Sequence, residues 1–134
     1  MPGCLRCERL NRRGVTIIKL KYKLWLADEE KLFGDGPCAI LQLVQRLGSL
    51  RQAAEELKMS YSQAWKLIKS LEARWGFKLI ESKSGGIAGG GSTLTRQGQD
   101  LIKTYRSFRQ EAVVELERLE NKWFSQQFRD SLYE

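Results

Sequence analysis

Side chains that can hydrogen-bond DNA bases recur at helical spacing between residues 61 and 74. Ser62, Gln63 and Lys66 lie in the first half of this segment. Glutamine can pair with adenine through two hydrogen bonds, and lysine can hydrogen-bond guanine or bind a phosphate. The charges over residues 60–83 sum to +3, within a total of +7 for the whole chain. The pattern indicates a DNA-binding surface, although polar residues are also ordinary on the solvent face of any amphipathic helix.

Flanking segments extend this candidate surface. Arg51 opens the preceding helix and Lys83 lies on the following hairpin, and both are placed to bind phosphate. Trp65 is expected to be a core or interface residue rather than a platform for base stacking. The predicted DNA-contacting residues are Arg51, Ser60, Tyr61, Ser62, Gln63, Lys66, Lys69, Lys83, Ser84, Gly85 and Gly86.

The chain offers little for catalysis or metal binding. It has no histidine, which removes the most common general base and every Ser–His or Cys–His pairing. The glycine-rich run over residues 82–98 lacks the lysine of a phosphate-binding loop, because Ser92 stands at that position. Cys4 and Cys7 form one C-x-x-C motif, which supplies too few ligands for a structural zinc. We therefore predict no enzyme and no metal or cofactor.

Length and composition predict one globular domain. The 134 residues are 42% apolar and 29% charged, which suits an ordinary folded core. No apolar segment approaches the roughly 20 residues that span a bilayer, so we expect a cytoplasmic protein without membrane contact. Residues 1–14 form a basic lead-in without periodicity and are read as loose.

Two consecutive capping boxes predict how the candidate surface is positioned. Residues 49–52 and 60–63 both fit the pattern S-x-x-Q, in which the two side chains satisfy free backbone N–H groups at a helix start. They open predicted helices over 50–57 and 61–74. Only a few residues separate the two helices, too few for antiparallel packing, so the arrangement indicates a helix-turn-helix.

The remaining elements complete a winged arrangement. Alternating apolar residues over 15–27 predict a strand, and residues 32–36 predict a brief return strand. A helix is expected over 37–47. Residues 77–82 and 92–95 read as two strands with the glycine run at their tip. A hairpin directly after a helix-turn-helix is better interpreted as a wing than as a phosphate-binding loop or a free linker.

A long helix is predicted after Thr95, over residues 96–128. Its apolar residues recur every three or four positions for about six turns. Such a seam is longer than a small domain needs to cover its own core, and it favours dimerisation. The seam consists of Leu101, Tyr105, Phe108, Ala112, Leu116, Leu119 and Trp123.

At this point a family resemblance becomes specific. The segments "GSLRQAAEELKMSYSQAWKLIKSLEARWG" and "LIESKSGGIAGGGSTLTRQGQDLI" resemble the winged-helix DNA-binding domain of ModE-type molybdate-responsive regulators. They are related more distantly to the LysR-type domain. The most specific elements are Gly48-Ser49, Ala53-Ala54, Ser60-Tyr61, Ala64-Trp65, the glycine-rich wing and Leu94-Thr95 with Gly98.

The resemblance implies an α+β, mostly helical fold and a homodimeric transcriptional regulator that binds an inverted-repeat operator in double-stranded DNA. The winged helix-turn-helix would span 15–95 with its wing at 77–94, and the helix over 96–128 would mediate dimerisation. Residues 61–69 would enter the major groove, and the wing at 82–92 would follow the backbone.

One departure from this family is large. Its full-length members carry a molybdate-binding module after this domain, whereas the sequence ends at Glu134. We therefore expect a form restricted to DNA binding, without direct molybdate binding. The alternative function is a winged-helix protein-interaction module or an accessory factor in the assembly of molybdenum or redox enzymes.

Overall fold

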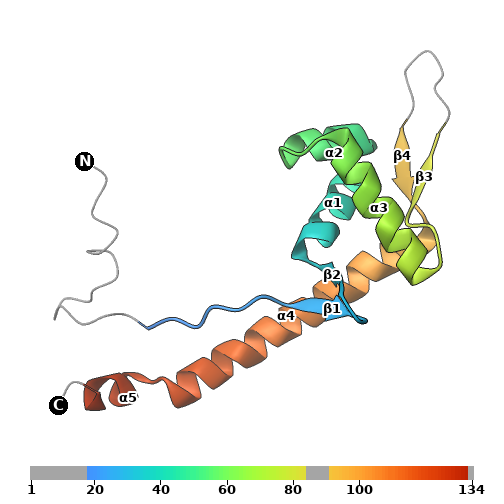
Figure 1. Ribbon diagram of the computed structural model, residues 1–134. Coiled ribbons are helices and arrows are strands. Elements are labelled where there is room, and N and C mark those ends of the chain that lie inside the picture. Colours follow the sequence, from blue (N-terminus) through green and yellow to red (C-terminus); the bar gives the residue numbers. More distant parts are fainter. Residues whose placement is uncertain (1–17, 84–90, 133–134) are drawn as a thin grey trace, which may run out of the picture. The chain divides into compact units, whose positions relative to one another are not determined.

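The computed structural model describes residues 18–83 and 91–132. The chain divides into two compact units, one made of residues 24–110 and the other of residues 1–23 with 111–134. The secondary-structure elements are β1 (Trp25–Ala27), β2 (Lys31–Gly34), α1 (Asp35–Leu47), α2 (Leu50–Glu56), α3 (Tyr61–Trp75), β3 (Ile80–Ser82), β4 (Ser92–Leu94), α4 (Arg96–Trp123) and α5 (Gln126–Ser131) (Figure 1).

Two glycines end helices of the 24–110 unit. Gly48 follows α1 with φ of 72°, and its N–H donates to the Val44 carbonyl. Gly76 follows α3 with φ of 81° and donates to the Glu72 carbonyl. Both glycines adopt the left-handed conformation that side chains disfavour. Helix α1 starts two residues earlier than the predicted 37–47, and the other predicted helix boundaries of the helix-turn-helix agree within one residue.

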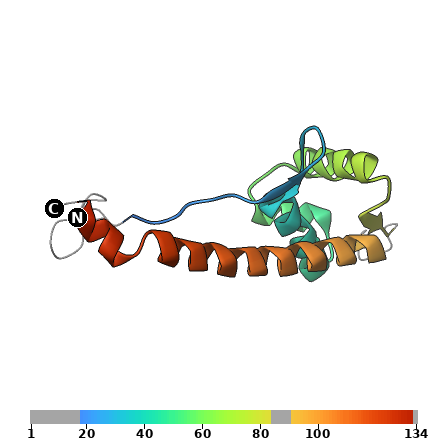
Figure 2. The same ribbon diagram turned by 90° about the horizontal axis from the view of Figure 1, so that it is seen from below.

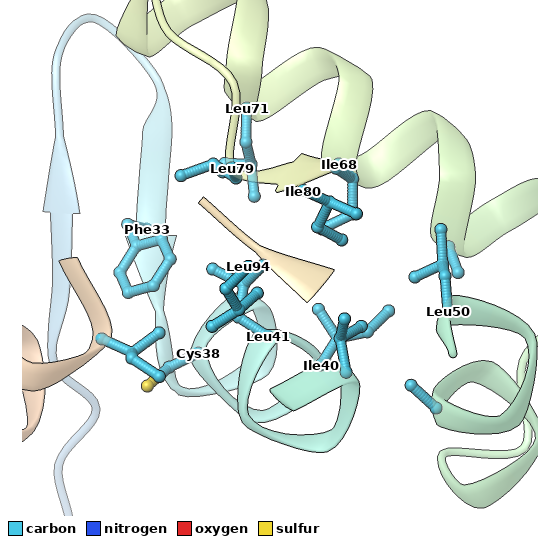
Figure 3. Close-up of a cluster of buried hydrophobic side chains, with 14 of the residues drawn as sticks. Phe33, Cys38, Ile40, Leu41, Leu50, Ile68, Leu71, Leu79, Ile80 and Leu94 are labelled. Carbon is cyan, nitrogen blue, oxygen red and sulfur yellow. The ribbon is translucent and has the colours of Figure 1, made fainter. Parts of the chain in front are cut away.

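The hydrophobic core of this unit joins all three short helices to both hairpins. Side chains from β2, α1, α2, α3 and the β3–β4 hairpin converge in one cluster (Figure 3). Phe33, Leu41 and Leu79 are fully buried. The ring of Tyr105 in α4 packs edge-on against Phe33 at a centroid distance of 5.2 Å. The first part of α4 therefore belongs to this core.

Two antiparallel hairpins flank the helices of this unit. In β1–β2, Trp25 pairs with Gly34, and in β3–β4, Ile80 pairs with Leu94. Arg74, at the end of α3, bonds the β1–β2 turn through Asp28, the Glu30 carbonyl at 2.9 Å and the Lys31 carbonyl. The helix-turn-helix followed by the β3–β4 wing confirms the predicted α+β, mostly helical winged fold.

The N-terminal strand is shorter than predicted. The expected strand covered 15–27; residues 15–17 lie outside the described residues, and within 18–27 only Trp25–Ala27 pairs with a neighbouring strand. In the other unit, the Leu20 N–H donates to Glu120 at 3.1 Å and the Ile18 carbonyl accepts from Arg129 at 2.9 Å. Side chains thus bond backbone groups that a partner strand would otherwise use. On the apolar side of the alternation, Ile18, Leu20 and Leu24 are half-buried, whereas Tyr22 and Leu26 are exposed.

The long helix ends earlier than the predicted 96–128. Helix α4 stops at Trp123, and α5 starts at Gln126 after a break visible in Figure 2. The Ser125 side chain accepts a hydrogen bond from the Phe128 N–H. When a serine hydroxyl, in place of a backbone carbonyl, accepts from an N–H group in the first turn, it favours the start of a new helix. Within residues 18–83 and 91–132, no helix is long and apolar enough to cross a membrane.

Candidate nucleic-acid interface

The turn between α2 and α3 is fixed at both helix starts. The Ser49 hydroxyl accepts from the Gln52 N–H at 3.2 Å. At the start of α3, the Ser60 hydroxyl accepts from the Gln63 N–H at 3.1 Å, and the Gln63 side chain accepts from the Ser60 N–H at 3.0 Å. Both caps were predicted from the sequence, and the reciprocal one at α3 is a complete capping box. The start of α3 is therefore well defined.

Helix α3 presents its polar face to solvent. Ala64, Ile68 and Leu71 are buried in the core. The opposite face is exposed, and it consists of Ser62, Gln63, Lys66, Lys69 and Ser70. Among the described residues, the side chains of Lys66 and Ser62 have no ion-pair or hydrogen-bond partner. Both side chains are therefore free to meet a ligand.

Gln63 has a structural role that limits its freedom. Its side-chain oxygen is held by the Ser60 N–H at 3.0 Å, so in this conformation its amide cannot rotate freely. The NH₂ group remains able to donate, for instance to N7 of a purine. Two-bond pairing with adenine would need the same oxygen to accept a second hydrogen bond. The capping box predicted this constraint, because the pattern uses the glutamine that we also assign to base reading.

Lys69 and Trp65 form a local cluster on one edge of α3. The Lys69 ammonium lies 3.0 Å from Glu72 Oε1 and 5.6 Å from the Trp65 ring centroid. The Trp65 side chain is 47% exposed, so of the two expected positions, core or interface, it does not occupy the core of its own chain. Because Glu72 partly neutralises Lys69, Lys69 carries less free positive charge than Lys66.

Glu72 connects α3 to the start of the β3–β4 wing. Its Oε2 accepts from the backbone N–H groups of Leu79 at 2.6 Å and Ile80 at 3.3 Å. Burial would raise the pKa of this carboxyl, but the hydrogen bonds from Leu79, Lys69 and Ile80 lower it overall. Sequence reasoning missed this residue. The available signal was a charged residue four positions after the buried Ile68, on the inner face of the helix.

The base of the wing is also bonded to the turn between α1 and α2. The Ser92 N–H donates to the Gly48 carbonyl at 2.8 Å, and the Lys83 N–H donates to the Gly91 carbonyl at 2.8 Å. Lys83, the residue after β3, is exposed. The predicted contacts Ser84, Gly85 and Gly86 lie outside the described residues.

Arg51 and Tyr61 meet across the helix-turn-helix. The Arg51 guanidinium lies 4.5 Å from the centroid of the Tyr61 ring. Both side chains are exposed. The structure thus brings together the predicted contacts of α2 and α3, with Ser60 at the cap between them.

The residues of the predicted seam of α4 differ in how deeply they are buried. The Tyr105 hydroxyl donates to Asp35 at 2.6 Å inside the 24–110 unit, and burial together with this bond raises the pKa of Tyr105. Leu101, Ala112 and Leu116 are half-buried, whereas Phe108, Leu119 and Trp123 are exposed. Tyr105 therefore packs within its own chain.

Metal ligands do not gather in the described part of the chain. Over residues 18–83 and 91–132, no group of three or more His, Cys, Asp or Glu side chains is placed to hold a metal ion. Cys38 is a buried thiol.

Comparison with known proteins identifies the domain. Residues 38–99 match the family model described as "Bacterial regulatory helix-turn-helix protein, lysR family". Residues 38–99 form a LysR-type helix-turn-helix domain. This LysR-type domain contains most of α1, all of α2 and α3, both wing strands and the start of α4.

Relatives of the LysR-type domain include ModE proteins. The chain is 37% identical over 83 residues to the "DNA-binding transcriptional dual regulator ModE" of Escherichia coli (strain K12), covering 61% of this chain and 32% of that protein. It is 30% identical over 111 residues to the "Molybdenum transport protein ModE" of Herbaspirillum seropedicae, covering 83% of this chain and 39% of that protein. The chain thus spans about a third of the length of these relatives, and the predicted resemblance to ModE-type regulators is confirmed.

Solved structures share the fold of the LysR-type domain. The "CbnR_DBD-DNA complex" is 22% identical, with a TM-score of 0.51, and the match covers 65% of this chain and 94% of that one. A DNA complex of a mutant of Lactococcus lactis ZitR is 19% identical with a TM-score of 0.51, covering 86% of this chain and 78% of that one. At these identities the likeness supports the winged helix-turn-helix fold alone.

Proposed function

We propose that this chain is a sequence-specific DNA-binding transcriptional regulator of the LysR/ModE type. The observation that carries the proposal is the exposed polar face of α3, held by a capping box beside a wing. Lys66 and Ser62 are available to meet base edges in the major groove, since recognition helices use their N-terminal residues. Arg51 and Lys83 supply charge for the phosphates, which gives affinity without sequence information.

We further propose that the protein acts as a homodimer on an inverted repeat. A two-fold axis places two recognition helices about 34–36 Å apart, one helical turn of DNA. Large apolar side chains stay exposed on α4, as expected for a surface that a second copy covers. In the predicted seam these side chains are Phe108, Leu119 and Trp123.

The test is selection of genomic DNA fragments by the purified protein at about 0.15 M salt, with and without molybdate. Enrichment of one inverted-repeat motif would support a dimeric, sequence-specific regulator. Molybdate-dependent enrichment would contradict our expectation that the chain does not bind molybdate directly. Recovery of fragments without any common motif would contradict the proposal and favour the protein-interaction module.

The two lysines of the recognition helix should differ in their contribution to DNA affinity. We expect Lys66→Ala to reduce the magnitude of the slope of log K against log salt by about 0.9, because the unpaired ammonium beside the base edges neutralises about one phosphate charge. Lys69→Ala should lower it by less, because Glu72 lies 3.0 Å from the Lys69 ammonium and already offsets its charge. Fluorescence anisotropy at several salt concentrations measures both slopes. Equal decreases would contradict this ranking.

The dimer proposal predicts that one charge on α4 separates the two copies. Leu119 is 38% exposed, so Leu119→Glu should leave the fold intact while placing a charge in the apolar interface, which costs several kcal/mol when unpaired. Sedimentation velocity should show a monomer for this variant and a dimer for wild type. Asn121→Glu, at an exposed polar position of the same helix, is the matched control and should stay dimeric. A monomeric wild type would contradict the proposal.

A further inference from the structure

Arg51 and Tyr61 are placed against each other by two separate helices. Arg51 is the second residue of α2, and Tyr61 is the first residue of α3. Their side chains meet with 4.5 Å between the guanidinium carbon and the ring centroid. This is well within the roughly 6 Å at which a cation and an aromatic face attract each other.

Both backbones under this pair are held firmly. Serine caps fix the starts of α2 and α3, and the neighbouring Leu50 and Ala64 are buried in the core. The two side chains themselves stay accessible, since the Tyr61 side chain is 41% exposed and Arg51 is exposed. The pair thus stands on well-fixed backbone and faces solvent. It lies at the start of the proposed recognition helix, α3.

Stacking leaves the hydrogen-bonding edge of an arginine free. A guanidinium that stacks flat on an aromatic ring keeps its five N–H donors in its own plane, directed away from the ring. Those donors can form two parallel bonds to a phosphate. An arginine already held by a ring loses less conformational freedom when it binds, which favours the bound state.

We propose that Tyr61 is a positioning residue, whose ring holds Arg51 in place to bind a DNA phosphate. This role rests on the proposed function and extends it, because Tyr61 then contributes to DNA affinity through Arg51. The sequence pattern instead placed Tyr61 among the residues that touch DNA directly. The two roles differ in what the tyrosine hydroxyl does: a positioning ring has no need of it, whereas a direct hydrogen bond to DNA requires it.

The hydroxyl and the ring can be removed separately. Tyr61→Phe keeps the aromatic face, and Tyr61→Ala removes it. Binding to a fluorescein-labelled duplex of mixed sequence is measured by anisotropy between about 0.05 and 0.2 M salt, because a phosphate contact acts on any sequence. We expect wild-type affinity for Tyr61→Phe and about threefold weaker binding for Tyr61→Ala, the loss of an exposed cation–aromatic contact. Circular dichroism of each variant checks that the fold is retained.

The double variant decides whether the effect passes through Arg51. Arg51→Ala should weaken binding and lower the salt slope by about 0.9. Adding Tyr61→Ala to Arg51→Ala should weaken binding no further, since the ring then has nothing to hold. Loss of affinity in Tyr61→Phe would overturn the proposal in favour of a direct hydroxyl contact, and a further loss in the double variant would overturn it as well. If the wild-type protein showed no salt-dependent binding to DNA, both this role and the proposed function would be overturned. If the wild type bound DNA and Tyr61→Ala bound it equally well, only this role would be overturned.

Discussion

Replacing Gly98 with alanine is expected to destabilise the protein by about 3 kcal/mol, the upper part of the range for overpacked sites. A β-carbon built on Gly98 would lie 2.5 Å from the Leu79 carbonyl oxygen and 3.3 Å from its carbonyl carbon. The atoms in the way are backbone, so a rotamer change cannot relieve the clash. The first turn of α4 or the backbone at Leu79, directly before β3, would have to move.

The surroundings of Gly98 make such a movement costly. The Gly98 N–H donates to the Thr95 hydroxyl at 3.0 Å, and that hydroxyl donates to the Lys78 carbonyl at 2.6 Å. The Thr95 N–H also donates to the Leu79 carbonyl at 2.9 Å. Leu79 itself is fully buried. A shift of α4 would therefore stretch several hydrogen bonds and open the core at the same time.

Urea unfolding followed by circular dichroism measures the effect of Gly98→Ala. The matched control is Gln97→Ala, which places the same residue one position earlier, where the side chain is exposed. Alanine at this control position should change the free energy of unfolding by about 0.5 kcal/mol or less. If both variants unfolded at the same urea concentration, the close approach of α4 to Leu79 would be contradicted.

Local signals allowed the helix-turn-helix to be predicted almost residue by residue. The caps at Ser49 and Ser60 and the helix end at Gly48 act within a few residues of their own positions. For that reason a single sequence was enough to place α2, α3 and the exposed face of α3. The same locality explains why Gln63 could be identified both as a cap and as a candidate base reader.

Features that depend on distant contacts could not be predicted. The sequence identifies Gly98 as part of a motif. Glycine is required there because α4 approaches the Leu79 backbone closely, and this approach depends on how α4 packs. The alternation over residues 15–27 was read as a strand, although a strand also requires a partner that periodicity does not reveal. The sequence predicts a core or interface position for Trp65, and only the orientation of α3 in the fold shows that its ring is exposed in this chain.

Glu72→Ala is expected to destabilise the protein by about 3 kcal/mol, because it leaves the backbone N–H groups of Leu79 and Ile80 without an acceptor in a buried position. Glu72 is only 8% exposed, so water cannot easily replace the carboxylate. Glu72→Gln keeps one acceptor oxygen but loses the charge that pairs with Lys69, and its cost should be smaller. Glu81→Gln, on an exposed position of β3, is the matched control and should be close to neutral.

The pH dependence of unfolding separates the charge of Glu72 from its shape. The pKa of Glu72 in the folded protein lies below its ordinary value of 4.5, so the unfolded chain binds a proton more readily than the folded one. The ionised carboxylate therefore stabilises the fold above about pH 4.5, and this contribution is lost as the pH falls through the lower folded-state pKa. Wild type should lose more stability between pH 6 and about pH 3 than Glu72→Gln, which has no proton to bind. Parallel pH profiles for the two proteins would show that the carboxylate charge does not hold the wing to the recognition helix, and would leave only the hydrogen-bonding shape of the side chain in that role.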